Sequence, residues 1–204
     1  MSRNKTSSRS PKRPQGTQAA PGFVRIIGGQ WRGRKLPVHD VTGLRPTTDR
    51  VKETLFNWLM ADIYQAKCLD LFAGSGGLGF EALSRQAEKV TLLEFDSKAA
   101  GQLKQNLAAL NTTSGKVVQT DTLAYLTKPG QPYDIVFIDP PFRRDMLATV
   151  FDLLEQNGWL ADNAMIYVEA ESELGQLQVP VSWSLHREKT AGQISYRLYQ
   201  REGQ

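Results

Sequence analysis

Asp70-Leu71-Phe72-Ala73-Gly74-Ser75-Gly76-Gly77-Leu78-Gly79 is the stretch that decides the fold, because it places a glycine-rich turn between a predicted strand and a predicted helix. Glycine has no Cβ atom, so the chain can turn sharply there and let a ligand approach the backbone and the N-terminal N–H groups of the helix. The simpler interpretation is a tight strand-to-helix turn that binds nothing. Glu94 argues against it, because it ends the next predicted strand, twenty residues after Gly74, where an acid can hydrogen-bond ribose hydroxyls.

Strand and helix patterns alternate on both sides of this turn. Apolar runs predict strands at 68–72, 90–94, 116–119, 133–138 and 164–168. Helical periodicity occupies 78–86, 97–110, 122–126 and 144–156. This alternation predicts an α/β fold with a mainly parallel sheet and helices on both faces. Alternating apolar and polar residues at 181–186 and 193–199 predict an antiparallel pair added to the sheet edge.

The N-terminal part has a different organisation. Residues 1–21 form a basic tail with too few apolar side chains to offset the entropy of ordering, so we expect it to be disordered. Residues 22–204 are expected to form a single domain, with a hairpin extension at 22–45 and a core at 46–204. The hairpin is predicted around Gly28-Gly29, and Arg45-Pro46-Thr47-Thr48-Asp49 supplies a turn and a helix-capping signal.

Charge is segregated along the 204-residue chain. Residues 1–39 carry nine Lys/Arg and no acid, whereas the remainder has 16 basic against 21 acidic residues. A basic arm on an acidic body favours a polyanion partner, most simply nucleic acid. For residues 1–20 a solubilising tail stays open. In the hairpin the charges interleave with aromatic residues such as Phe23 and Trp31, which favours a binding surface.

Composition excludes several classes. No apolar run approaches the roughly 18 residues of a membrane span, and no apolar stretch follows the basic N-terminus as in a secretory signal. A transit peptide remains an alternative. One cysteine, Cys68, and two histidines make a zinc site a poor interpretation. We therefore expect a cytoplasmic monomer without metal or membrane attachment.

S-adenosyl-L-methionine fits the glycine turn better than NAD or FAD does. Asp70 ends the strand before the glycines, where its carboxylate suits a cationic amino acid group and would repel a pyrophosphate. Asp121 follows the third strand within reach of an adenine amine. It is equally a candidate N-cap for the helix that begins at Thr122, and both roles can hold together.

Ile138-Asp139-Pro140-Pro141-Phe142 follows another buried strand and carries the predicted chemistry. Its two prolines hold a carboxylate, a free carbonyl and an aromatic ring at the strand's carboxyl end. Amino-methyltransferases, which alkylate nucleobase amines or a glutamine amide, have a motif similar to Asp-Pro-Pro-Phe. Two acceptors on the N–H groups orient the nitrogen lone pair toward the methyl group, and Phe142 can stack on an unpaired base. In the alternative interpretation Asp139 caps a helix and Phe142 belongs to the core.

Three further segments, 25–34, 44–56 and 183–201, resemble signatures of the RsmD family of bacterial rRNA methyltransferases. The resemblance implies a Rossmann-like class I methyltransferase with a mixed seven-stranded sheet and a small N-terminal hairpin. It also implies methyl transfer to the N2 amine of a guanine in 16S rRNA, within the small ribosomal subunit or an assembly intermediate. The residue chemistry alone reaches only an amine in nucleic acid and does not choose guanine over adenine, or RNA over DNA.

Three groups of site residues follow. For the cofactor we expect Asp70, Phe72, Gly74, Ser75, Gly76, Gly79, Glu94, Phe95, Asp121 and Thr122. For the base and the chemistry we expect Asp139, Pro140, Pro141 and Phe142. For RNA we expect Arg25, Trp31, Arg32, Arg34, Lys35, Arg45, Thr47, Thr48 and Arg50.

Three competing functions stay open. A DNA or RNA adenine-N6 methyltransferase shares the Asp-Pro-Pro-Phe motif, although the DNA enzymes usually need a target-reading insertion for which the chain has no spare length. An NAD-dependent oxidoreductase would need an acid/base at the hydride site, and neither His39 nor His186 follows a suitable strand. A non-catalytic RNA-binding protein would bind the cofactor without turnover.

Overall fold

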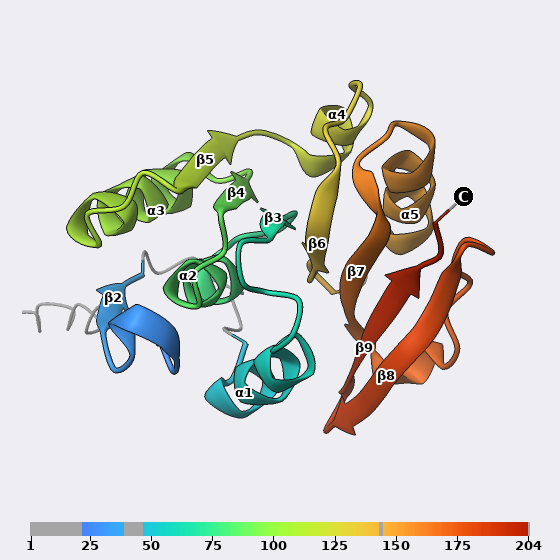
Figure 1. Cartoon of the computed structure of the whole chain (residues 1–204), viewed down its shortest axis with the longest axis horizontal. Helices are drawn as coiled ribbons and strands as arrows, with labels where there is room; N and C mark the ends of the chain where they lie inside the picture. The colour runs from blue at the N-terminus through green and yellow to red at the C-terminus, as the bar shows by residue number, and fades with distance from the viewer. Residues whose placement is uncertain (1–21, 39–46, 143–144, 204) are drawn as a thin grey trace, which may run out of the picture.

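A seven-stranded mixed sheet forms the centre of the computed structural model, which describes residues 22–38, 47–142 and 145–203. The strands lie in the order β5-β4-β3-β6-β7-β9-β8 (Figure 1). Their bounds are β3 Lys67–Asp70, β4 Lys89–Glu94, β5 Gly115–Gln119, β6 Tyr133–Ile138, β7 Leu160–Glu171, β8 Trp183–Ala191 and β9 Ile194–Arg201. The first five are parallel, and β9 and β8 add an antiparallel pair beyond β7. The predicted fold and edge pair are confirmed.

Helices cover both faces of this sheet. One apolar cluster joins α1 (Asp49–Trp58), α2 (Gly77–Ser84) and α3 (Ser97–Ala109) to one face. A second cluster joins α4 (Thr122–Leu126) and α5 (Leu147–Gln156) to the other face. Successive strand residues alternate between the two clusters, as the two-residue period of a strand requires. None of the helices in the described part of the chain is long and apolar enough to cross a membrane.

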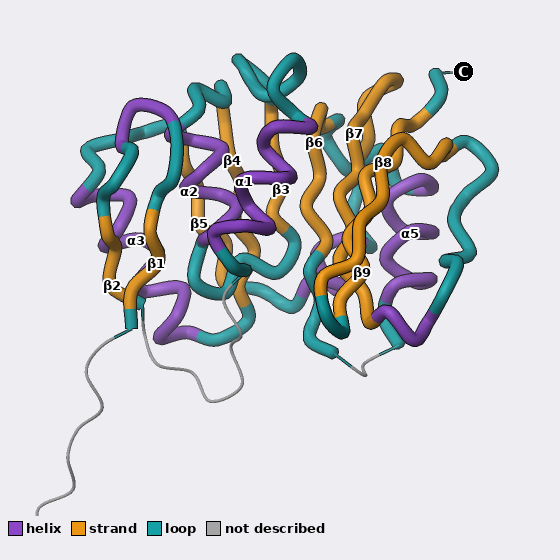
Figure 2. The backbone as a smooth tube through the Cα atoms, turned by 90° about the horizontal axis from the view of Figure 1, so that it is seen from below, coloured by secondary structure: helices purple, strands orange, loops and turns teal. Residues whose placement is uncertain are grey.

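The N-terminal hairpin differs from the prediction. Its strands are short, β1 Phe23–Arg25 and β2 Lys35–Pro37, and the 3-10 turn η1 (Gly29–Trp31) lies between them in place of a tight glycine turn. The strands end early because contacts with α2 take over: the Ile27 N–H donates to Glu81 Oε2 at 2.8 Å. Figure 2 shows the hairpin beside α2 and α3. The hairpin is therefore packed onto the helices of the main sheet.

Several element boundaries also differ, among them that of the strand predicted at 181–186, which is observed as β8 at Trp183–Ala191. The strand predicted at 164–168 runs from Leu160 to Glu171, because β9 pairs with it as far as Glu171 and Leu160 pairs with Tyr133 across a bulge. The helix predicted from residue 144 begins at Leu147. The predicted tail at 1–21 and Arg45 lie outside the described residues.

Candidate cofactor and base-binding site

The carboxyl ends of three adjacent strands bring three acidic side chains to one edge of the sheet. Asp70 ends β3 beside Phe137 of β6, and Phe137 in turn lies beside Tyr167 of β7. Asp139 directly follows β6, two residues after Phe137, and Glu169 lies in β7, two residues after Tyr167. Burial raises the pKa of Asp139 well above its ordinary value, and the negative charges of Glu169 and Asp70 raise it further. These three carboxylates thus lie in one electrostatic site.

The glycine turn begins directly after Asp70. Gly74 and Gly76 have φ angles of 50° and 79°, in the left-handed region that favours glycine. Gly76 is the N-cap residue of α2, and a Cβ atom on it would lie 2.2 Å from the Phe80 ring. Gly79 has a different purpose: its Cβ atom would lie 2.6 Å from Leu92, so this glycine lets α2 approach the sheet closely.

Glu94 holds the turn from the neighbouring strand. Its Oε2 accepts the Gly74 N–H and its Oε1 accepts the Asp96 N–H, both at 2.8 Å. The next residue, Phe95, leaves its ring 75% exposed. The structure therefore places a carboxylate and an open aromatic ring beside the turn. Their cofactor roles remain predictions.

Asp70 is only 3% exposed. Burial raises the pKa of Asp70 to about 7, although hydrogen bonds from the backbone of Phe72 and Gly79 lower it, and the charge of Glu94 adds to the rise. Burial penalises the charged carboxylate, so a cation beside it would be stabilised strongly. The carboxylate thus fits the cationic amino acid group of S-adenosyl-L-methionine.

The two other predicted cofactor residues have structural partners. Asp121 caps α4, accepting the Ala124 N–H at 2.8 Å, as the alternative interpretation predicted. Thr122 is buried, and its hydroxyl donates to the Leu71 carbonyl at 2.6 Å, which ties α4 to the end of β3. Ser75 is buried in the turn and Phe72 is half-buried.

Only the second half of the Asp-Pro-Pro-Phe segment is exposed. Phe142 leaves 40% of its surface open, so the interpretation that places it in the core is wrong. Asp139 does not cap the following helix either, because the N-cap residue of α5 is Met146. Asp139 and Pro140 are half-buried, and Pro141 is exposed. The Thr47 hydroxyl lies 3.5 Å from Asp139 Oδ2.

Glu169 is the site residue that the sequence analysis missed. It is 4% exposed, and its Oε1 accepts the Tyr167 hydroxyl at 2.7 Å. The available signal was the position of this carboxylate inside the apolar run Ile166-Tyr167-Val168-Glu169-Ala170. Acidic residues are almost never fully buried unless they are paired.

Among the residues predicted to bind RNA, some already contact other parts of the protein, and others are exposed. Several are already engaged: Arg25 pairs with Asp49, Arg34 Nη2 donates to the Ala109 carbonyl at 3.0 Å, and Lys35 lies over the Phe23 ring. Trp31 is half-buried and packs against the core, and Thr48 is the N-cap of α1. Arg32 and Arg50 are exposed.

Buried Lys52 fixes the hairpin relative to the site. Its Nζ donates to the Arg25 carbonyl at 2.5 Å and lies 3.2 Å from Asp49 Oδ1. Because α1 begins next to Thr47, this contact links the basic hairpin to the segment beside Asp139.

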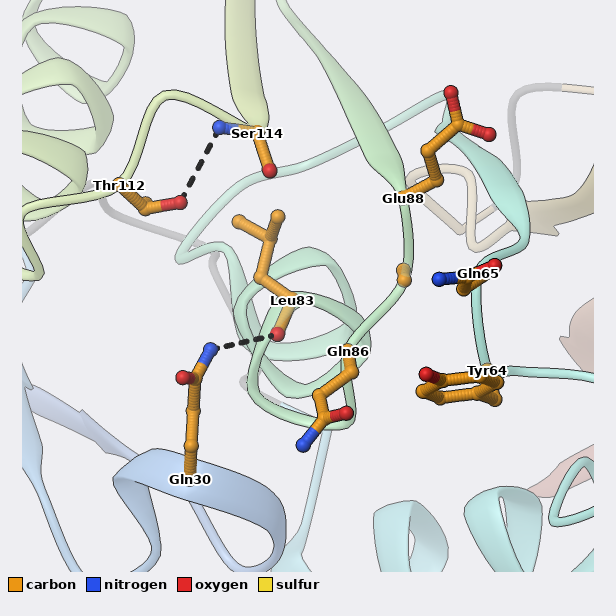
Figure 3. Close-up of a pocket in the computed structure, with 9 residues that line it drawn as sticks. Gln30, Tyr64, Gln65, Leu83, Gln86, Glu88, Thr112 and Ser114 are labelled. Atoms are coloured by element: carbon orange, nitrogen blue, oxygen red, sulfur yellow. Dashed lines mark hydrogen bonds between the residues drawn. The ribbon is translucent and has the colours of Figure 1, made fainter.

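One cavity lies away from these residues. About 280 Å³ in volume, it is lined by Gln30, Tyr64, Gln86 and Ser114 at the amino ends of β3, β4 and β5 (Figure 3). A smaller hollow lies beside Gly74 and Ser75. We place the site by the carboxylates and the glycine turn, because ligands of open α/β sheets bind at the carboxyl ends of the strands. Across the described residues no cluster of three or more His, Cys, Asp or Glu is suited to hold a metal.

Known proteins match this chain closely. The family described as "Conserved hypothetical protein 95" matches residues 24–200. Ribosomal RNA small subunit methyltransferase D of Escherichia coli K12 is 61% identical over 90% of this chain and 92% of its own length. Its Haemophilus influenzae counterpart is 56% identical over 90% and 97%. The solved putative methyltransferase yhhF from Escherichia coli is 59% identical, covers 90% of this chain and 100% of its own, and has a TM-score of 0.85. The resemblance predicted from the sequence is thus confirmed: this chain belongs to the family of ribosomal RNA small subunit methyltransferase D.

Proposed function

We propose that this protein transfers a methyl group from S-adenosyl-L-methionine to the exocyclic N2 amine of a guanine in 16S rRNA of the small ribosomal subunit. The observation that carries the proposal is the Asp-Pro-Pro-Phe segment, with half-buried Asp139 and exposed Phe142, beside the glycine turn at the carboxyl ends of β6 and β3. The names of the Escherichia coli and Haemophilus influenzae relatives support small-subunit rRNA as the substrate.

The glycine turn and the carboxylates around it would hold the cofactor, which supplies an activated methyl group. Asp70 would pair with the amino group of the methionine moiety, because its buried carboxylate gains most from a nearby cation. Glu94 would accept from the ribose hydroxyls while it holds Gly74, since a carboxylate accepts several hydrogen bonds. The exposed Phe95 ring would cover the adenine.

Asp139 would orient the guanine amine. Its carboxylate and the Pro140 carbonyl accept the two N–H groups, which directs the nitrogen lone pair toward the methyl group and favours the positive charge that develops on nitrogen. The N–C bond would form as the sulfur–methyl bond breaks, and the nitrogen would then pass one proton to the Asp139 carboxylate that accepts its N–H. The exposed Phe142 ring would stack on the base.

The basic hairpin would hold the RNA beside this site. We propose that residues 22–204 act as one monomeric unit in the cytoplasm, with 22–45 as the RNA-contacting extension. Exposed Arg32 is the leading candidate for a phosphate contact. The tail at 1–21 would add sequence-independent attraction to RNA through its positive charge.

The proposal is tested by transfer of labelled methyl to ribosomal subunits that lack the modification, with the product nucleoside identified. N2-methylguanosine in small-subunit RNA is the expected product. Asp139→Ala should reduce transfer far more than cofactor affinity, while Asp152→Ala, an exposed carboxylate on α5, should change neither. N6-methyladenine would overturn the guanine assignment, and equal losses of transfer and cofactor affinity in Asp139→Ala would overturn its assignment to the amine.

RNA binding by the hairpin is tested through salt dependence. Arg32→Glu combined with Arg34→Glu should flatten the dependence of RNA affinity on salt by about 0.7 to 0.9 in log–log slope for each phosphate that the protein no longer neutralises. Arg187→Glu with Lys189→Glu, exposed on the edge strand β8, is the matched control. An unchanged slope in the hairpin variant would show that Arg32 and Arg34 do not contact phosphates of the RNA.

A further inference from the structure

We infer that Glu169 selects guanine by accepting a hydrogen bond from its N1–H, beside the amine held by Asp139. This inference rests on the proposed function and names a residue that decides which base is methylated. The Asp-Pro-Pro-Phe segment cannot make that choice by itself, because guanine and adenine both carry an exocyclic amine.

The sheet places the two carboxylates next to each other. β6 and β7 are parallel neighbours in which Phe137 pairs with Tyr167 and Ile138 with Val168. The Phe137 and Tyr167 rings lie 6.4 Å apart in the cluster that faces α1. Since side chains alternate between the faces of a strand, Glu169 lies on the same face of β7 as Tyr167, and Asp139 directly follows the end of β6. The pKa of Asp139 agrees, because after burial the charge of Glu169 is the largest cause of its rise.

Tyr167 fixes how Glu169 is presented. The Tyr167 hydroxyl donates to Glu169 Oε1 at 2.7 Å, and both side chains are buried. Burial raises the pKa of Tyr167 well above its ordinary value, and the charge of Glu169 raises it further. Tyr167 therefore stays protonated and remains the donor. The two oxygens of a carboxylate together accept about four hydrogen bonds, so Glu169 can accept one from a base while it keeps the bond from Tyr167 and its other interactions.

Two adjacent acceptors match the Watson–Crick edge of guanine. That edge presents donors at two neighbouring positions, N1–H and the N2 amine. Adenine presents one donor, its N6 amine, beside the lone pair of N1. If Asp139 holds the amine in each case, adenine places its N1 lone pair against Glu169. Burial makes this mismatch expensive, because a buried group that loses its partner is not compensated by water.

The segment that carries Thr47 lies beside Asp139. The Thr47 hydroxyl lies 3.5 Å from Asp139 Oδ2, and Thr47 is itself half-buried. A base that reaches both carboxylates displaces the Thr47 side chain and takes over its place on Asp139. The same move excludes water from the two acceptors, which increases the penalty for the wrong base.

The test replaces the target guanine by 2,6-diaminopurine in the RNA of a reconstituted small subunit. This base keeps the 2-amine but has a lone pair at N1 where guanine has N1–H. The wild-type protein should prefer guanine by roughly a hundredfold in methyl transfer, the effect of leaving one buried hydrogen-bonding group without its partner. In Glu169→Gln the amide can donate to N1, so the preference should fall by roughly tenfold or more. Glu173→Gln, an exposed change on η2, should keep the wild-type ratio.

A second variant keeps the test informative if Glu169→Gln folds poorly. Tyr167→Phe removes the hydroxyl that orients Glu169, and it should lower the guanine preference in the same direction but by less. S-adenosyl-L-methionine affinity, measured by calorimetry, reports that each variant is folded. An unchanged guanine-to-diaminopurine ratio in a folded Glu169→Gln protein would overturn the inference. Failure of the wild-type protein to methylate guanine N2 at all would instead overturn the proposed function.

Discussion

Replacing Asp70 with asparagine should remove a pH dependence from the stability of the protein. The pKa of the buried carboxyl is raised to about 7 from an ordinary 3.8, chiefly by burial. The folded state therefore keeps a proton that the unfolded chain releases. The stabilisation from Asp70 is fully present below the unfolded pKa and is lost as the pH rises through about 7.

The size of the effect follows from the same shift. Each pKa unit corresponds to about 1.4 kcal/mol, so the full window amounts to roughly 4 kcal/mol. Between about pH 5 and about pH 8 the free energy of unfolding of the wild-type protein should fall by roughly 2 to 3 kcal/mol relative to Asp70→Asn. Urea unfolding of both proteins at the two pH values measures this difference. Asp62→Asn, which changes an exposed carboxylate, controls for the substitution itself.

As the pH rises, the affinity for the cofactor should increase, whereas the stabilisation from Asp70 decreases. Deprotonated Asp70 attracts the amino group of S-adenosyl-L-methionine, so wild-type affinity should rise with pH through the neutral range. Asp70→Asn should bind roughly 10- to 100-fold more weakly, the worth of a hydrogen bond to a charged group, with little pH dependence. Calorimetric titration measures both. A difference in stability between the two proteins that stays constant with pH would refute the burial argument, and wild-type affinity in Asp70→Asn would refute the pairing with the amino group.

Three further predictions follow from the site and the hairpin. Because the pKa of Asp139 is raised well above its ordinary value, chiefly by burial, single-turnover methyl transfer should increase as the pH rises through it; a flat profile would contradict a role for the carboxylate form. Glu81→Ala should lower the free energy of unfolding by roughly 3 to 5 kcal/mol, since Glu81 is fully buried and joins the hairpin to Arg85; a loss below about 1 kcal/mol in urea unfolding would contradict this. Gly29→Ala should lower the melting temperature more than Gly33→Ala does. Both positions have a positive φ, but only at Gly29 would a Cβ atom lie 1.9 Å from the Ser84 carbonyl. Equal losses would show that the hairpin moves enough to relieve this contact.

The parallel core could be predicted because its information is local. Apolar runs and helical periodicity identify elements over a few residues, and the glycine turn needs its own residues and no distant partner. The exposure of Phe142 could also be predicted from local sequence, because the two prolines before it prevent a strand or a helix from continuing. Each of these predictions concerns the conformation of one segment and does not depend on which other segments lie beside it in the fold.

The hairpin and the full site depend on contacts far apart in the sequence. The 3-10 turn replaces a tight hairpin because Ile27 donates to Glu81, 54 residues away. Thr47 lies 92 residues from the aspartate that it contacts.

By itself, the sequence determined the sheet, the glycine turn and the Asp-Pro-Pro-Phe segment, because propensity, periodicity and proline stiffness act along the chain. Only the tertiary structure decided which acids share a site. A strand pattern gives the face of a residue but not its neighbour, and strand order and register set that neighbour. In the sequence Glu169 is one acid in an apolar run. Because β6 lies beside β7 in the fold, its charge acts on Asp139.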